Sequence, residues 1–195
     1  ALASKENMRT QSFAQKLCVS AKGDVDRIKN ATLEDGQKGL LFSLSNHKVL
    51  YANGIYDKVY PASITKIMTA MLALQSGKLD DMVTITQENV TLEEGSQVCG
   101  FVAGDQVTLD QLLHCLLAYS GNDAASAIAE YVGGTTENFV QMMNDYAARL
   151  GCTGTHFTNP HGLQDENHYT TPYDIYLMLN EAFTYPEFTE ITELP

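Results

Sequence analysis

The chain has 195 residues, which is long enough to bury one sizeable hydrophobic core. No apolar stretch approaches the roughly 20 residues that a membrane-spanning helix needs. The net charge of −12 is distributed unevenly, with +5 over residues 1–78 and −17 over residues 79–195. Because nucleic acids bind clustered Lys and Arg, this acidic chain is not expected to bind them.

The N-terminal part of the chain is weakly patterned. Residues 1–38 are polar and are interpreted as an N-terminal extension, in which residues 11–28 could form a helix. The first three residues, Ala-Leu-Ala, are similar to the end of a signal-peptide cleavage site. Residues 39–53 hold two β-like runs around a polar turn, which predicts a β-hairpin.

A long buried helix is expected after the hairpin. Pro61 suits its first turn, and the helix should run to about Gln75 and end at Gly77. Its apolar residues lie on most of its circumference, which predicts burial on nearly all sides.

Mostly helices are expected in the remainder. A strand is expected at residues 83–85 and a loop at 93–104. Three helices follow at 108–119, 123–132 and 136–150, then a second loop at 156–169 and a last helix at 171–184. Thr136 is expected to cap the third of the three helices, and Tyr185-Pro186 to end the last helix. The pattern predicts an α/β protein of the α+β type, whose visible strands belong to a larger sheet.

Ser63 and Lys66 form a Ser-x-x-Lys motif at the start of the buried helix. Residues i and i+3 are neighbours on one helical face, so the hydroxyl and the amine should lie side by side. Desolvation there would lower the pKa of the lysine toward that of a useful base. The alternative is an incidental Ser beside a Lys that extends to water. A second match, Ser45 and Lys48, lies in the hairpin turn and is interpreted as chance.

Ser120-Gly121-Asn122 is the only Ser-x-Asn in the chain. Alone, it would be turn chemistry between two helices. With Ser63 and Lys66 it could complete a site for acyl transfer through a serine ester, because a hydroxyl nucleophile needs a base to take its proton.

Several segments together closely resemble the low-molecular-mass penicillin-binding proteins, and more narrowly the serine-type D-alanyl-D-alanine carboxypeptidases. They are residues 61–70 (PASITKIMTA), residues 120–125 (SGNDAA), Thr155-His156-Phe157 and His161-Gly162-Leu163. The resemblance runs from about Gly39 to Phe183. It implies a penicillin-binding protein or serine β-lactamase-like transpeptidase fold, with an antiparallel sheet flanked by helices and an all-helical region. Residues 39–195 would be a partial catalytic domain.

The resemblance also implies residue roles and a reaction. Ser63 would be the acylated nucleophile, Lys66 its base and Ser120 a proton relay toward the leaving D-alanine. Asn122 would bind the substrate amide, and the Ser63 backbone amide would form half of an oxyanion hole. The reaction would be hydrolysis of the terminal D-Ala-D-Ala bond of peptidoglycan stem peptides, outside the cytoplasmic membrane. β-Lactams would be covalent inhibitors, and neither a cofactor nor a metal is implied.

One departure from the family concerns its Lys-Thr-Gly motif, which this sequence does not contain, since no Lys follows Lys78. A free terminal carboxylate is expected to need a cationic partner. After Ser120 the sequence offers only Arg149. The chain is therefore interpreted as lacking the C-terminal strands and the membrane-anchoring segment of the family, and alone it is expected to hydrolyse D-Ala-D-Ala peptides poorly.

Three alternatives stay open. A class A β-lactamase would carry an E-x-x-L-N loop, but the nearest match, YLMLN at residues 176–180, has Tyr in place of Glu. A non-catalytic peptidoglycan- or β-lactam-binding module would fit the missing cation. The three histidines of the 156–169 loop could bind a metal, although no H-E-x-x-H is present. No C-x-x-C occurs, and a bridge between Cys99 and Cys115 cannot be deduced from their spacing.

Overall fold

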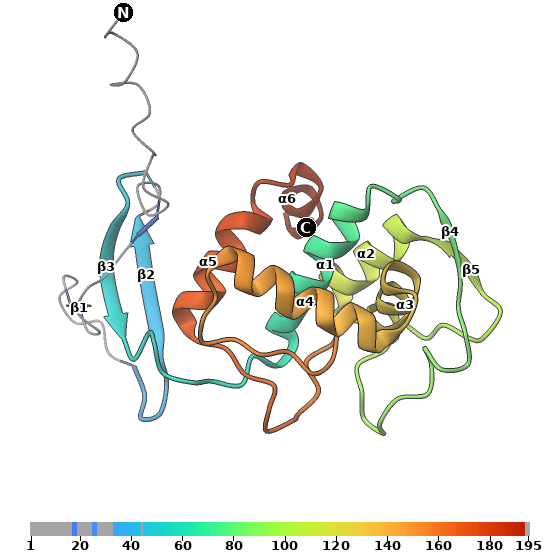
Figure 1. Ribbon diagram of the computed structural model, residues 1–195, viewed down its shortest axis with the longest axis horizontal. Helices are drawn as coiled ribbons and strands as arrows, with labels where there is room; N and C mark the ends of the chain where they lie inside the picture. Colours follow the sequence, from blue (N-terminus) through green and yellow to red (C-terminus); the bar gives the residue numbers. More distant parts are fainter. Residues whose placement is uncertain (1–16, 19–24, 27–32, 44, 194–195) are drawn as a thin grey trace, which may run out of the picture. The chain divides into compact units, whose positions relative to one another are not determined.

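The computed structural model describes residues 17–18, 25–26, 33–43 and 45–193, and the chain divides into two compact units, Ala1–Asp57 and Lys58–Pro195. The described elements of the first unit are β1 (Val25–Asp26), β2 (Gly39–Ser43) and β3 (Lys48–Asn53). Those of the second unit are mostly helices (Figure 1): η2 (Ala62–Thr65), α1 (Lys66–Ser76), β4 (Met82–Thr84), β5 (Gln106–Thr108), α2 (Leu109–Tyr119), α3 (Asn122–Gly133), α4 (Thr136–Leu150), α5 (Pro172–Ala182) and α6 (Pro186–Thr192). The α+β organisation expected from the sequence is confirmed.

The first unit contains an antiparallel sheet with the strand order β1-β3-β2. β2 and β3 form the expected hairpin, with a register shift between Leu41 and Phe42. β1 pairs with the other edge of β3, where Val25 lies opposite Ala52. Val25 was expected within a helix, and this expectation is wrong at this position. Its backbone hydrogen-bonds to β3 instead, and such a long-range partner cannot be recognised from the local sequence pattern. The rest of the expected 11–28 helix lies outside the described residues, apart from residues 17–18 and Asp26.

α1 is the central helix of the second unit and contacts α2, α3, α4 and α5. Figure 1 shows it lying among these helices. Met68, Ala70, Met71 and Ala73 are fully buried, so the burial on nearly all sides predicted from the sequence is confirmed. The helix ends where expected, at Gly77, whose φ of +66° suits a residue without a side chain.

Threonine side chains cap the N-terminal ends of α2 and α4. The Thr108 side chain accepts from the Gln111 amide while the Gln111 side chain accepts from the Thr108 amide, which is the expected capping box. In α4 the cap is Thr135, whose side chain accepts from the Asn138 amide, and Thr136 is already helical. The prediction that Thr136 caps α4 is therefore wrong by one residue, because two adjacent threonines offer the same chemistry.

Besides β1, the structure contains two further elements that the sequence pattern did not predict. β5 pairs with β4 in an antiparallel ribbon, and Val83 lies opposite Val107. α6 begins at Pro186, where the chain was expected to leave helical structure. Proline suits the first turn of a helix because its missing amide proton would have no acceptor there. Phe188 and Ile191 of α6 are buried, so apolar packing holds this short helix in place.

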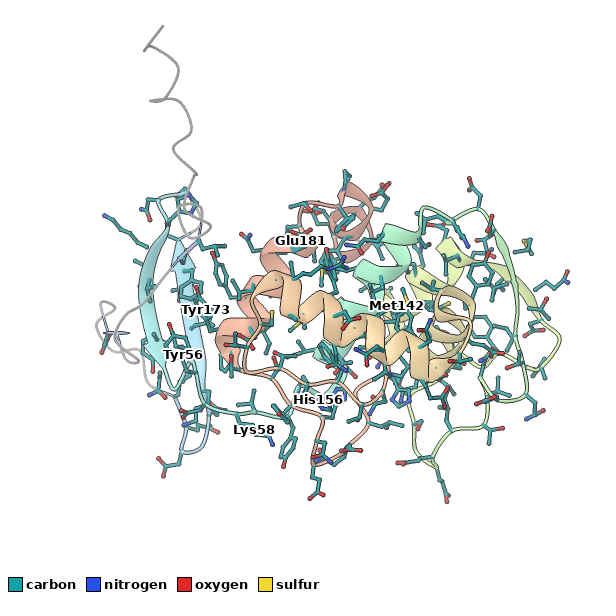
Figure 2. The ribbon with its side chains drawn as sticks, viewed as in Figure 1. Tyr56, Lys58, Met142, His156, Tyr173 and Glu181 are labelled. Carbon is teal, nitrogen blue, oxygen red and sulfur yellow. The ribbon has the colours of Figure 1, made fainter. Side chains whose placement is uncertain are left out.

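Two isolated antiparallel bridges hold the loop after α4. Val59 at the start of the second unit pairs with Thr170 of the loop, and His156 pairs with Tyr169 across the loop itself. The Lys58 amine lies 3.7 Å from the centre of the Tyr169 ring, and the His156 ring centre lies 5.9 Å from it (Figure 2 labels Lys58 and His156). These contacts fix both ends of the loop that passes beside Ser63 and Lys66. Within the described part of the chain, no helix is both long enough and apolar enough to cross a bilayer.

Candidate active site

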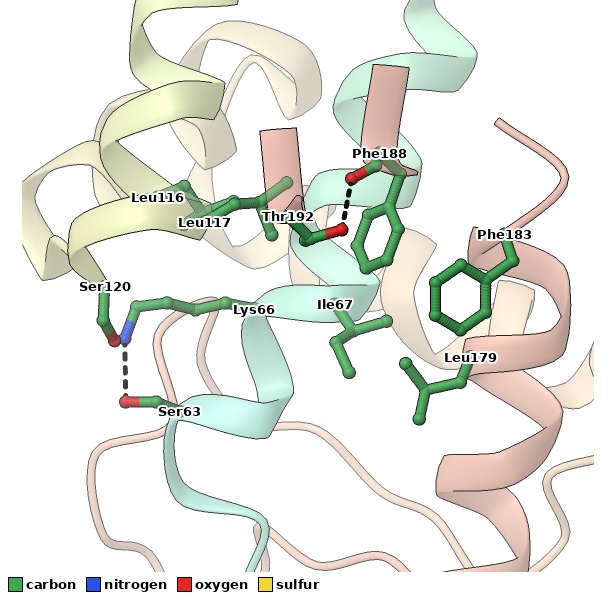
Figure 3. A pocket seen from close by; sticks show the side chains of 10 residues that line it. All are labelled: Ser63, Lys66, Ile67, Leu116, Leu117, Ser120, Leu179, Phe183, Phe188 and Thr192. Atoms are coloured by element: carbon green, nitrogen blue, oxygen red, sulfur yellow. Dashed lines mark hydrogen bonds between the residues drawn. The ribbon is translucent and has the colours of Figure 1, made fainter. Parts of the chain in front are cut away.

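Ser63 lies in the 3-10 turn η2, and Lys66 is the first residue of α1. In a 3-10 turn the side chains at i and i+3 eclipse one another, which brings the two side chains closer than in an α-helix. The Lys66 amine lies 3.1 Å from the Ser63 hydroxyl, and Figure 3 shows this contact. The juxtaposition predicted from the Ser-x-x-Lys spacing is therefore present in the structure.

The Lys66 amine has three oxygen partners. Besides Ser63 Oγ it donates to Asn122 Oδ1 at 2.7 Å and to the His161 carbonyl at 3.0 Å. The residue is only 3% exposed. Burial penalises the ammonium and lowers the pKa of Lys66 to about 8, although the nearby Cys99 opposes this shift. An amine with this pKa is partly neutral near physiological pH, which a proton acceptor for the Ser63 hydroxyl requires.

Asn122 reaches Lys66 because of the turn between α2 and α3. Ser120 ends α2 in the left-handed conformation, with φ of +63°, and α3 begins at Asn122. Gly121 between them has no room for a side chain, because an added Cβ would overlap the Cys99 sulfur. Asn122 is 5% exposed, and its backbone amide donates to the Gln97 carbonyl at 2.8 Å. The turn is thus held by the loop that precedes β5.

Asp123 attaches that loop to the start of α3. Its carboxylate is 1% exposed and accepts from the backbone amides of Cys99, Gly100 and Phe101 at 2.9, 3.0 and 3.3 Å. It also accepts from the Ala124 amide at 2.9 Å, near the helix N-terminus, which favours negative charge. Asp123 therefore fixes the position of residues 97–101 against the Ser120-Gly121-Asn122 turn.

Ser63 and Lys66 open into a cavity of about 350 Å³. Ser120 lines the same cavity, and Figure 3 shows its side chain directed toward the space beside the Lys66 amine. The opposite wall is apolar and is formed by α1, α2, α5 and α6, with the side chains of Ile67, Leu116, Leu117, Leu179, Phe183 and Phe188. The cavity thus has a polar end with two hydroxyls and one amine, and a largely apolar remainder.

A strained backbone precedes Ser63. Ala62 has a φ of +47°, a left-handed conformation that costs a residue with a side chain on the order of 1–2 kcal/mol. Gly162 packs directly against the Ala62 carbonyl, and any Cβ at this position would overlap it. Gly162 follows His161, whose carbonyl accepts from Lys66. The His161-Gly162 segment therefore contacts both the backbone before Ser63 and the Lys66 amine.

His168 connects this loop to the same turn. The Thr158 amide donates to His168 Nδ1 at 3.0 Å, so Nε2 carries the proton and donates to Thr65 Oγ1 at 2.7 Å. The residue is 2% exposed, and burial lowers the pKa of His168 to about 4. Burial, with Lys66 and His168 nearby, also lowers the pKa of His161 to about 4. Both rings are thus neutral at physiological pH.

The structure brings together all four residues that were singled out in the sequence, namely Ser63, Lys66, Ser120 and Asn122. It adds the His161 carbonyl, which sequence reasoning missed because a main-chain acceptor has no side-chain signature. It also adds Asp123 and His168, which fix the surrounding loops. The cluster of three acidic or ligating side chains that a metal site requires is not found among the described residues.

The chain is similar to several known proteins. Residues 29–194 match the family described as D-alanyl-D-alanine carboxypeptidase. The D-alanyl-D-alanine carboxypeptidase DacF of Bacillus subtilis is 37% identical over 177 residues, which are 88% of this chain and 45% of that protein. DacC of Escherichia coli is 38% identical over 154 residues, or 74% of this chain and 38% of that protein.

A crystal structure of a D-alanyl-D-alanine carboxypeptidase from Mycobacterium tuberculosis matches with a TM-score of 0.79 at 32% identity, covering 88% of this chain and 66% of the other. This likeness confirms the fold expected from the sequence motifs, that of the penicillin-binding D,D-peptidases. The chain belongs to the D-alanyl-D-alanine carboxypeptidase family. It spans less than half of the length of the two curated relatives just described.

Proposed function

We propose that this chain carries the acylation centre of a serine D-alanyl-D-alanine carboxypeptidase, with Ser63 as nucleophile. The observation that carries the proposal is the buried Lys66 amine in contact with both Ser63 Oγ and Asn122 Oδ1. The substrate would be the terminal D-Ala-D-Ala bond of peptidoglycan stem peptides. Support for this substrate comes from the family to which the chain belongs.

Acylation would begin with transfer of the Ser63 hydroxyl proton to neutral Lys66. The Ser63 oxygen attacks the carbonyl of the scissile bond, and a tetrahedral intermediate forms. The bond to the terminal D-alanine then breaks, and Ser120, which lines the same cavity, passes the proton from Lys66 to the departing amine. Water subsequently hydrolyses the ester, with Lys66 again as the base, which regenerates the Ser63 hydroxyl.

The negative charge of the intermediate would develop next to the backbone amide of Ser63. This amide belongs to the turn that opens α1, where the first amide protons have no acceptor within the helix. The left-handed Ala62 sets the direction in which the chain enters the turn. Asn122, already held by Lys66, would offer its side-chain amide to the substrate. The site is thus assembled before a ligand arrives, which is what stabilisation of a transition state requires.

The same hydroxyl would open the ring of a β-lactam and form a stable acyl ester, so penicillins should bind covalently. A peptidoglycan substrate places the protein on the outer side of the cytoplasmic membrane or in secreted form. We expect the reaction to need no cofactor, and we expect no binding of nucleic acid.

A second candidate is a module that is acylated by β-lactams or binds peptidoglycan without turnover. One observation favours it: among the described residues that line the cavity, Lys66 is the only cationic one. Arg149 lies on α4 over the Tyr146 ring, 4.8 Å from its centre, and lines a different cavity. No described cation other than Lys66 is therefore placed to bind the free carboxylate of D-Ala-D-Ala.

A fluorescent penicillin tests the proposal directly. We expect covalent labelling of the wild-type chain, seen after denaturing electrophoresis and placed on Ser63 by peptide mass spectrometry. Ser63→Ala should lose the label, while Ser45→Ala, which alters the other Ser-x-x-Lys motif, should keep it. Labelling of Ser63→Ala, or an unlabelled wild type that is folded by circular dichroism, would overturn the proposal. Release of D-alanine from a D-Ala-D-Ala peptide then separates the two candidates.

A further inference from the structure

Two cysteines meet behind the Ser120-Gly121-Asn122 turn. Cys99 lies in the loop before β5, and Cys115 lies on α2, four residues before that helix ends. The Cys99 thiol donates to the Cys115 carbonyl at 3.7 Å. Burial, with Cys115 and Asp123 nearby, raises the pKa of Cys99 to about 12. Both cysteines are reduced in the structure.

The Cys115 carbonyl is the acceptor that ends α2. It accepts from the backbone amide of Ser120 and, at 3.2 Å, from that of Gly121. The Cys99 sulfur contacts Gly121 from the other side, at the position where a Cβ would overlap it. The turn that presents Asn122 to Lys66 is therefore enclosed between the two cysteine residues.

We propose that Cys99 and Cys115 form a disulfide that clamps this turn. The proposal rests on the Cys99 sulfur lying 3.7 Å from the Cys115 carbonyl oxygen, and on the partial exposure of both residues, which gives an oxidant access to them. A disulfide requires Cα atoms within roughly 7 Å and side chains directed toward each other. Because the Cys99 sulfur already lies against the main chain of Cys115, rotation about the side-chain bonds of the two cysteines would bring the sulfurs together.

The chemistry is an exchange with an oxidised disulfide compound, such as oxidised glutathione or a thiol oxidase of the cell envelope. The Cys115 thiolate attacks one sulfur of that compound, forming a mixed disulfide and releasing one thiol. Cys99 then loses its proton to solvent and attacks the Cys115 sulfur, releasing the second thiol. Two S–H bonds are lost and one S–S bond forms; the oxidised compound takes up the two electrons, and its two released thiolates take up two protons from solvent, which replace those that the cysteines gave to it.

The cross-link would affect both stability and the site. It closes a ring of residues 99–115, and a loop of this length restricts the unfolded chain substantially. It would also hold Gly121 and hence Asn122 against Lys66. The cross-link itself does not depend on the proposed acylation, whereas its effect on the position of Asn122 rests on that proposed function.

Cys152 serves as the matched control. It is buried, and its thiol donates to the Asp174 carbonyl at 3.6 Å. Burial, with Asp174 nearby, raises the pKa of Cys152 to about 12. Cys152 follows the end of α4, and its described thiol contact is with Asp174 rather than with Cys99 or Cys115. It should therefore stay a free thiol under conditions that join Cys99 to Cys115.

The experiment equilibrates the chain in mixtures of oxidised and reduced glutathione, followed by acid quenching, alkylation of free thiols in denaturant and peptide mass spectrometry. We expect the Cys99 and Cys115 peptides to be joined and two hydrogens lighter, with Cys152 alkylated. Reductant should lower the melting temperature of the wild type and of Cys152→Ser by about 5–10 °C, and should not change that of Cys115→Ser.

Alkylation of both Cys99 and Cys115 at the most oxidising ratio would overturn the proposal, and so would a melting temperature that reductant does not change in the wild type. The rate of penicillin labelling, measured with and without reductant, separates this proposal from the previous one. A chain that shows the joined peptides but is never labelled contradicts the proposed function and leaves the cross-link standing.

Discussion

The chain contains two Ser-x-x-Lys motifs, and their surroundings differ completely. Ser45 and Lys48 lie at the hairpin of the first unit, are both exposed, and the Ser45 hydroxyl lies 3.3 Å from that of Ser43. Ser63 and Lys66 lie at the start of a buried helix, where Lys66 is 3% exposed and its amine has three oxygen partners. The spacing alone therefore does not create chemistry. Burial of the amine lowers its pKa, and the turn fixes it beside the hydroxyl.

Removal of the amine should give the largest effect. Lys66→Ala leaves Ser63 without a proton acceptor, and we expect acylation by penicillin to slow by about 10²–10⁴-fold, the usual contribution of a general base. Stopped-flow fluorescence or quenched labelling measures the rate constant. Lys48→Ala, the corresponding change in the exposed motif, should leave the rate unchanged. Equal rates for Lys66→Ala and the wild type would show that another group takes the proton.

The pH dependence of acylation should follow Lys66. Its pKa is lowered to about 8, and only the neutral amine can accept a proton, so the rate should rise with pH and level off above about 8. Below that midpoint the neutral fraction changes about tenfold per pH unit, so the rate at pH 6 should be roughly a hundredth of the plateau. Labelling rates between pH 5.5 and 9.5 test this. A profile that is flat across pH 8 would exclude Lys66 as the base.

A charge placed beside the amine should shift that midpoint. Asn122→Asp would put a carboxylate oxygen where Asn122 Oδ1 now lies, 2.7 Å from Lys66 Nζ. An opposite charge at this distance raises the pKa of an amine by about 1–3 units, so the midpoint of the labelling profile should move above pH 9. Asn122→Ala removes an acceptor from the ammonium and should move the midpoint down instead. Shifts in the same direction for both variants would contradict this reading of the contact.

The sequence alone predicted that Ser63 and Lys66 lie side by side, because this contact depends on short-range geometry. The three-residue spacing of Ser63 and Lys66 is sufficient to bring them together in any helical turn. The motif containing Asn122 identified the partner, although only the fold shows that its oxygen contacts the amine. The His161 carbonyl could not be predicted, since every residue has a carbonyl and only tertiary structure selects one.

The fold was predicted less evenly, and each error has a local cause. Adjacent threonines made the cap of α4 ambiguous, and the structure selects Thr135 over Thr136. Pro186 could end one helix or begin another, and burial of the apolar side of α6 decides for the second. Val25 pairs with a strand 27 positions later, a long-range contact that no window of neighbouring residues contains.

The loop of residues 156–169 supports Ser63 and Lys66, and among the described residues the exposed motif has no such loop beside it. We expect acid to lower the free energy of unfolding through the histidines of this loop. Burial lowers the pKa of both His161 and His168 from 6.5 to about 4. The unfolded chain therefore binds more protons than the folded chain below pH 6.5, and stability that is fully present above pH 6.5 is lost as the pH falls toward 4. Each histidine should contribute a loss of about 2–3 kcal/mol between pH 6.5 and 4.5.

His168→Gln tests this part of the comparison. Glutamine can keep the hydrogen bond to Thr65 Oγ1 but has no titrating ring, so the variant should lose about half as much stability on acidification as the wild type. Urea unfolding at pH 6.5 and 4.5 measures the difference. His114→Gln, a change of a partly exposed histidine on α2, should behave as the wild type does. If His168→Gln and the wild type lose the same free energy, the pKa of His168 is not lowered in the folded chain, and the acid sensitivity must come from other groups.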